Sequence, residues 1–377
     1  MISRYYEDLG KYLEPNKALV IYGSRQVGKT TLLDKFLSET NYKYKLDSGD
    51  NVQVQNILSS QNFNKIIDYA SGYEVIAIDE AQRIPSVGLG LKIIIDQVPN
   101  IRIIATGSSS FELAGQVGEP LTGRKRTLTL FPVSFLELRK NYNLSELDER
   151  LPEHLVFGSY PAVVTAKTKE DKASVLKEIV NSFLLKDILE LEKVKGSKVL
   201  FDLLRLVAYQ VGSEVSLTEL GTQLGIDYKT VGRYLDLLEK AFVLYNLRGF
   251  SRNLRKEITK KSKYYFYDNG VRNSIISNYN DLEIRNDQGQ LWVNFLVAER
   301  LKVQEYKRIW ANNYFWRTWE HKEVDWVEER EGKLFGYEFK YSSKKKRLPK
   351  TFLESYPDSE LQIISPQNYR DFLALKR

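Results

Sequence analysis

The chain of 377 residues contains no cysteine and only two histidines, His154 and His321. The absence of cysteine excludes disulfide bonds, thiolate zinc sites and cysteine nucleophiles. Two histidines are too few for a multi-histidine metal cluster. No apolar run approaches the length of a membrane span, and the polar N-terminus lacks the pattern of a signal peptide. We therefore expect a cytoplasmic protein that makes no membrane contact.

The composition is that of an ordinary globular protein. Hydrophobic residues make up 42% of the chain and charged residues 28%. The length predicts two to three domains with substantial cores. The net charge of +7 permits a nucleic-acid partner without requiring one, so the clustering of basic residues has to decide.

The most specific pattern follows the apolar run Ala18–Tyr22 and precedes a helical segment. It has the P-loop spacing G-x-x-x-x-G-K-[ST] and comprises Gly23, Ser24, Arg25, Gln26, Val27, Gly28, Lys29 and Thr30, with Thr31 next in the chain. The glycines let backbone N–H groups surround phosphate oxygens, and the helix N-terminus favours the same anion. Lys29 is predicted to reach the β- and γ-phosphates, and Thr30 to ligate Mg²⁺. The alternative is a glycine-rich turn that merely caps a helix. We expect ATP and Mg²⁺ as cofactors.

A second motif, Glu74–Glu80, reads as a buried parallel strand that ends in two acids. The carboxyl edge of the sheet is also where the P-loop opens. Asp79 is therefore predicted to hold the Mg²⁺ shell, and Glu80 to orient or deprotonate the attacking water. A strand that ends in a solvated turn is the alternative.

Two further features extend this predicted site. The strand Ile101–Ala105 ends in small polar residues, of which Ser108 is the first candidate for a γ-phosphate sensor and Thr106 the second. A plain polar turn is the alternative. Downstream, Arg124 in a Leu-Thr-Gly-Arg turn is a candidate arginine finger, acting within its own chain or on a neighbouring one. A surface basic turn explains it equally well.

The order of these motifs, followed by Phe131-Pro132-Val133-Ser134-Phe135, resembles a family of prokaryotic ATPases related to the AAA+ superfamily. In that family an AAA_14-type core is joined to a C-terminal DUF4143-type region. The resemblance covers essentially the whole chain. It implies a doubly wound ATPase fold and Mg²⁺-ATP, and it leaves the substrate open.

The middle of the chain predicts a winged helix. A capping-box start at Ser216 opens a short helix that ends near Gly225, and a second helix runs from residue 227 or 228 to Ala241. Residues 243–247 and 264–267 read as the strands of a wing. The candidate nucleic-acid contacts are basic residues of the second helix and of the wing tip, namely Lys229, Arg233, Arg252, Arg255 and Lys256. A protein-interaction module with a solvated hairpin tip is the alternative.

The C-terminal region predicts a nuclease-like core. After a helix over 290–302, strands are expected at 313–317, 323–327 and 334–339. Asp325 on one strand and Glu338-x-Lys340 on the next match the PD-(D/E)XK arrangement. Asp325 and Glu338 would hold a divalent cation, and Lys340 would steady the nucleophile or the developing charge.

One departure from that arrangement bears on its activity. The family usually has Glu-Asn after the apolar pair of the preceding helix, where this chain has Val293-Asn294. Glu299 lies nearly two helical turns further on and should not replace the missing acid. Three readings stay open: an active nuclease, a degenerate DNA- or protein-binding module, and a structural ion pair of Asp325 with Lys340.

We predict an α/β protein: a doubly wound parallel P-loop sheet over residues 1–145, a helical linker and winged helix over 146–268, and a small restriction-endonuclease-like domain over 269–377. The predicted function is Mg²⁺-dependent ATP hydrolysis that couples nucleotide state to DNA binding or processing. The alternatives are a nucleotide-dependent switch that recruits a protein partner, and an ATP-regulated nuclease. DNA, a homo-oligomer and an unidentified protein are the partners considered.

Overall fold

The computed structural model describes residues 2–108, 120–184, 197–251, 262–318, 320–342 and 350–375. The chain forms two compact units. The first consists of Arg4–Phe131 with Lys240–Phe242, and the second of Met1–Ser3, Pro132–Glu239 and Val243–Arg377. The chain therefore passes into the second unit after Phe131. The predicted domain limits at residues 145 and 268 stay predictions.

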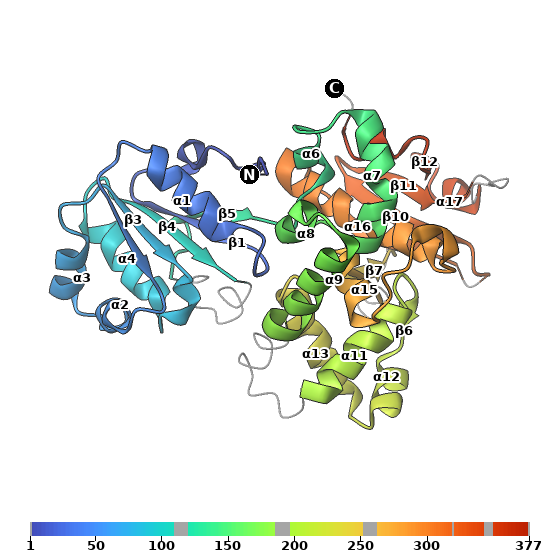
Figure 1. Cartoon of the computed structure of the whole chain (residues 1–377), viewed down its shortest axis with the longest axis horizontal. Coiled ribbons are helices and arrows are strands. Elements are labelled where there is room, and N and C mark those ends of the chain that lie inside the picture. Colours follow the sequence, from blue (N-terminus) through green and yellow to red (C-terminus); the bar gives the residue numbers. More distant parts are fainter. Residues whose placement is uncertain are drawn as a thin grey trace. The chain divides into compact units, whose positions relative to one another are not determined.

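The first unit is built on a five-stranded sheet in the order β2-β3-β4-β1-β5. All neighbouring strands are parallel, as the doubly wound prediction requires. Because the strands are parallel, the carboxyl ends of β1, β3 and β4 lie at one edge of the sheet, and the order places β4 between β3 and β1 (Figure 1). The strands are β1 (Lys17–Tyr22), β2 (Tyr44–Ser48), β3 (Val75–Asp79), β4 (Arg102–Gly107) and β5 (Lys125–Thr129).

Both faces of this sheet are buried at β1, because alternate residues of the strand point to opposite sides and Ala18–Tyr22 are all buried. Ala18 and Val20 belong to a core shared with α2, α3 and α4, while the intervening Leu19 is 1% exposed on the other face. The N-terminal segment forms a short 3₁₀ turn, η1. The helical elements are η1 (Leu9–Tyr12), α1 (Lys29–Glu39), α2 (Val52–Leu58), α3 (Phe63–Ala70), η2 (Ala81–Arg83) and α4 (Val87–Gln97).

The second unit combines many helices with a mixed sheet. Its first helices are α6 (Phe135–Leu138), α7 (Leu144–Phe157), α8 (Pro161–Thr165), α9 (Lys169–Glu178), the π-helical segment η3 (Ile179–Leu184) and α11 (Ser197–Tyr209). They are followed by α12 (Leu217–Leu224), α13 (Tyr228–Lys240), α15 (Asn269–Ile275), η4 (Leu282–Ile284), α16 (Gln288–Lys307), α17 (Lys350–Ser355) and α18 (Tyr369–Phe372).

One seven-stranded sheet runs through this unit in the order β12-β11-β10-β9-β7-β8-β6. The strands are β6 (Glu214–Val215), β7 (Leu244–Gly249), β8 (Ser262–Phe266), β9 (Asn312–Arg317), β10 (Glu323–Arg330), β11 (Lys333–Phe339) and β12 (Glu360–Ile364). Parallel pairing of β7 with β9 joins the strands expected for the wing to those expected for the nuclease-like core.

The helix pair α12 and α13 has the predicted local signals. The Ser216 side chain accepts a hydrogen bond from the backbone N–H of Glu219 at the start of α12. Gly225 ends α12 in the left-handed conformation, with φ of 67°. Because only three residues separate the two helices, this pair forms a tight helix–turn–helix.

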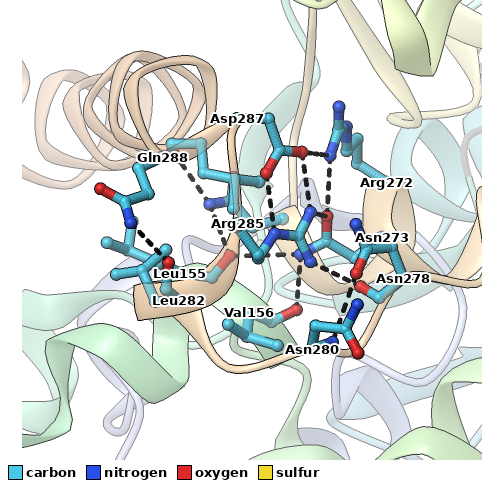
Figure 2. A network of polar contacts seen from close by, with 12 residues as sticks. Leu155, Val156, Arg272, Asn273, Asn278, Asn280, Leu282, Arg285, Asp287 and Gln288 are labelled. Atoms are coloured by element: carbon cyan, nitrogen blue, oxygen red, sulfur yellow. Dashed lines mark hydrogen bonds and ion pairs between the residues drawn. The ribbon is translucent and has the colours of Figure 1, made fainter.

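A buried polar network ties the helices of this unit together (Figure 2). The Asp287 carboxylate accepts hydrogen bonds from Arg285 Nε at 2.8 Å and from Arg272, and both guanidiniums are at most 3% exposed. Burial raises the pKa of Asp287, but the bonds from Arg285 and Arg272 outweigh it and lower that pKa to about 2. Arg272 also donates to the Ala208 carbonyl near the end of α11. One carboxylate thus holds two buried cations that link α15, η4 and α11.

Candidate functional site

The loop at residues 23–30 follows β1 directly and has the backbone conformation that its glycines permit. Gly23 has φ of 152°, and a Cβ built there would lie 2.1 Å from the Leu130 carbonyl oxygen. Gly28 has φ of 94° and caps the N-terminus of α1. Side chains at these two positions would be excluded by close approach and by backbone strain respectively.

Lys29 and Thr30 begin α1 and turn toward different partners. The Lys29 ammonium donates to the carbonyls of Gly23 at 2.8 Å and Ser24 at 3.0 Å, both within the loop. The Thr30 hydroxyl donates to Asp79 Oδ2 at 2.8 Å. Two motifs 49 residues apart in sequence therefore meet at the carboxyl edge of the sheet. A hydroxyl and a carboxylate side by side are the hard oxygen donors that suit Mg²⁺.

Thr106, at the end of β4, completes this group. Its hydroxyl donates to Asp79 Oδ1 and accepts a hydrogen bond from the Glu80 backbone N–H at 3.2 Å. Glu80 itself has a left-handed backbone, with φ of 50°, and its carboxylate accepts from the Gln82 amide. Thr106 thus positions both acids of the second motif.

The register of the sheet explains why Thr106 occupies this place. Ile78 pairs with Ala105, so the next residues along the two parallel strands, Asp79 and Thr106, are neighbours. Ser108, the first sequence candidate for the sensor, is buried beyond the end of β4. Thr106, the second candidate, contacts both Asp79 and the Glu80 backbone.

Arg124 lies at the wrong edge of the sheet for a role at the P-loop of its own chain. It immediately precedes β5, and its carbonyl accepts from the Ala18 N–H at the start of β1. Ala18 and Gly23 are five residues apart, which corresponds to about 16 Å along a parallel strand. The Arg124 guanidinium instead pairs with the Asp96 carboxylate at 2.7 Å. The expectation of a finger acting within the chain is therefore wrong; action on a neighbouring chain stays a prediction.

The nuclease-like residues meet across β10 and β11. Pairing of Trp326 with Tyr337 makes Asp325 and Glu338 cross-strand neighbours. Asp325 Oδ2 accepts from the Phe339 N–H at 2.8 Å, and the Lys340 ammonium pairs with Glu338 at 2.6 Å. The structural alternative of an Asp325–Lys340 pair is therefore replaced by a Glu338–Lys340 pair.

The two acids perturb one another. Burial, followed by the nearby Asp325 carboxylate, raises the pKa of Glu338 to about 7, against the opposing effect of Lys340. Burial also raises the pKa of Asp325. In the part of the chain that the structure describes, no group of three or more histidine or acidic side chains is placed to hold a metal.

The helix that lacks the expected acid uses its neighbouring residues for structure. The Asn294 side chain accepts from the Phe266 N–H at 2.7 Å and donates to the Phe266 carbonyl at 3.0 Å, which anchors α16 to β8. Glu299 is buried, where it accepts from the Phe135 N–H at 2.7 Å and pairs with Lys302. Its carboxylate is therefore occupied by other partners.

The candidate nucleic-acid residues are described only in part. Lys229 and Arg233 lie one turn apart on α13, and both are exposed. Arg252, Arg255 and Lys256 lie outside the described residues. Across the described ranges, no helix is both long and apolar enough to cross a membrane.

Comparisons with known proteins match three successive segments of the chain to families. Residues 15–139 match the AAA domain family AAA_14, residues 148–282 a domain of unknown function, DUF8612, and residues 288–371 another, DUF4143. An uncharacterized protein of Mycobacterium tuberculosis is 27% identical over 96% of this chain and 79% of its own length. An uncharacterized protein of Haemophilus influenzae is 28% identical over 73% of this chain and 74% of its own length. The solved structure of a RuvB variant from Thermotoga maritima aligns at 20% identity over 61% of this chain and 81% of its own, with a TM-score of 0.30.

Proposed function

Because the chain has an AAA domain of the AAA_14 family at residues 15–139 and a DUF4143 domain at residues 288–371, we propose that it binds Mg²⁺-ATP at the P-loop and hydrolyses it. The observation that carries this proposal is the 2.8 Å contact of the Thr30 hydroxyl with Asp79. That contact brings the phosphate-binding loop together with Asp79, an acid from a different motif 49 residues later in the sequence.

Each residue has a distinct part in the proposed reaction. The backbone N–H groups of residues 24–30 bind the phosphates, and Lys29 exchanges its loop carbonyls for phosphate oxygens. Mg²⁺, when bound by Thr30 and Asp79, would neutralise charge on the β- and γ-phosphates. Glu80 orients the attacking water and accepts its proton, while the Thr106 hydroxyl holds Asp79 in place.

Two substitutions test these roles. Lys29→Ala removes the cation that contacts the phosphates, so ATP affinity measured by equilibrium titration is expected to fall at least tenfold. Glu80→Gln retains the shape of the side chain and loses the base, so ATP binding is expected to persist while turnover stops. Unchanged ATP affinity in Lys29→Ala would sink the proposal.

We further propose that the second unit contacts DNA through a winged helix that contains α12, α13, β7 and β8. The proposal is supported by the tight helix–turn–helix and by the exposed cations Lys229 and Arg233 on one face of α13. A helix that presents cations one turn apart suits the phosphate backbone of duplex DNA. The coupling of this contact to ATP turnover is part of the same proposal.

DNA affinity measured at several salt concentrations tests the second proposal. The double variant Lys229→Gln with Arg233→Gln is expected to bind DNA more weakly than the wild type. The slope of log affinity against log salt concentration should become shallower by roughly one unit for each cation removed. Lys307→Gln, which removes an exposed lysine of α16, is the matched control and should match the wild type. Salt-insensitive or undetectable DNA binding by the wild type would favour the protein-recruiting switch instead.

A further inference from the structure

Arg4 is a buried arginine of the first unit, 8% exposed, that lies against the P-loop. One of its terminal nitrogens, Nη1, donates to the Val27 carbonyl, and the other, Nη2, donates to the Phe131 carbonyl at 2.6 Å. Val27 lies inside the P-loop, while Phe131 is the last residue before the chain enters the second unit. A single guanidinium therefore connects the phosphate-binding loop to the end of the first unit.

The geometry points to Arg4 as a positioning residue of the nucleotide site, a role that rests on the proposed ATP binding. In a planar trans peptide the C=O and N–H groups point in opposite directions. Fixing the Val27 carbonyl toward Arg4 therefore turns the Gly28 N–H away from Arg4. That N–H is one of the donors that a P-loop offers to phosphate.

The other end of the loop is held by the same segment. The Leu130 N–H donates to the Tyr22 carbonyl at 2.7 Å, and Gly23 packs directly on the Leu130 carbonyl. Leu130 thus supports the start of the P-loop, and Phe131 supports its final turn through Arg4. The loop shape depends on a segment about a hundred residues later in the sequence, to which Arg4 connects it.

Arginine suits this position because its planar guanidinium presents several donors in a fixed fork and stays charged at all accessible pH values. A lysine would retain the charge but offers a compact ammonium that does not reproduce the fork. Arg4→Lys therefore separates the contribution of charge from that of bridging, and Arg4→Gln removes the charge as well.

The experiment measures equilibrium binding of ATP and of ADP to the full chain, well below the melting temperature of each variant. Arg4→Gln is expected to weaken both nucleotides about tenfold or more, because the loop amides contact phosphates that ATP and ADP share. Arg4→Lys is expected to weaken both several-fold. Arg102→Gln is the matched control and should bind both nucleotides normally. Arg102 lies at the opposite edge of the sheet, where its guanidinium donates to the Asn100 carbonyl.

Other outcomes overturn the inference. Wild-type affinity in Arg4→Gln, even with a lowered melting temperature, would make Arg4 a structural support only. Full rescue by Arg4→Lys would refute bridging, and a loss confined to ATP would assign Arg4 to the γ-phosphate instead. Should Arg4→Gln not fold, Arg4→Lys decides alone, and wild-type affinity there refutes the inference. Failure of the wild type to bind either nucleotide would instead refute the proposed function, so the two failures are distinguishable.

Discussion

Replacing Glu338 by glutamine should make the protein more stable at alkaline pH than the wild type. The side chain of Glu338 is only 12% exposed, and it lies beside a second buried carboxylate, that of Asp325. The Glu338 Oε2 atom is buried and has no hydrogen-bond partner among the residues that the structure describes. Glutamine retains the shape of the side chain and cannot acquire the negative charge that this site disfavours.

The magnitude follows from the raised pKa. The pKa of Glu338 rises from the ordinary 4.5 to about 7, and each pKa unit corresponds to about 1.4 kcal/mol. Because the folded state holds the proton more tightly than the unfolded state, the stabilisation is fully present below pH 4.5 and is lost as the pH rises through 7. Between pH 4.5 and pH 8 the wild type is therefore expected to lose about 3 kcal/mol relative to Glu338→Gln.

Urea unfolding of both proteins across this pH range measures the difference, with Glu354→Gln, an exposed glutamate of α17, as the control that should follow the wild type. A pH-independent difference between Glu338→Gln and the wild type would refute the reasoning. The same assay addresses metal binding. Because the described residues place no group of three metal-binding side chains there, Mg²⁺ without nucleotide is expected to leave the stability of the wild type unchanged. A Mg²⁺-dependent rise that Glu338→Gln abolishes would favour the nuclease alternative.

The remaining predictions concern one residue in each unit. Thr106→Val removes the donor to Asp79 and the acceptor for the Glu80 N–H. ATP turnover should therefore fall about tenfold or more, with a smaller change in ATP affinity. A loss of ATP affinity without a loss of turnover would contradict the positioning role. Asp287→Asn leaves two buried guanidiniums without their carboxylate, so the free energy of unfolding at pH 7 should fall by about 3 kcal/mol. Calorimetry or urea unfolding measures this, and a loss near zero would show that the Asp287 contacts with Arg272 and Arg285 in Figure 2 do not stabilise the fold.

Local patterns in the sequence were sufficient to predict the elements of the site. Gly23, Gly28, Lys29 and Thr30 follow one another closely, so their spacing alone indicates a strand, a loop and a helix N-terminus. The acids after the apolar run Val75–Ile78 likewise predict the edge of a parallel sheet, since an uninterrupted apolar strand must be buried on both faces. The parallel fold and the closeness of the two motifs follow from the same information.

Relations between distant segments were decided only by the tertiary structure. Whether Ser108 or Thr106 contacts Asp79 depends on the register of β3 against β4, and a turn rich in small polar residues does not encode that register. Arg124 has the residue type of a finger, but its place before β5 puts it at the amino edge. Arg4 lies 23 residues from Val27 and 127 from Phe131, in a segment without a motif. Non-local contacts of this kind arise when strands are ordered and paired, so only the folded chain establishes them.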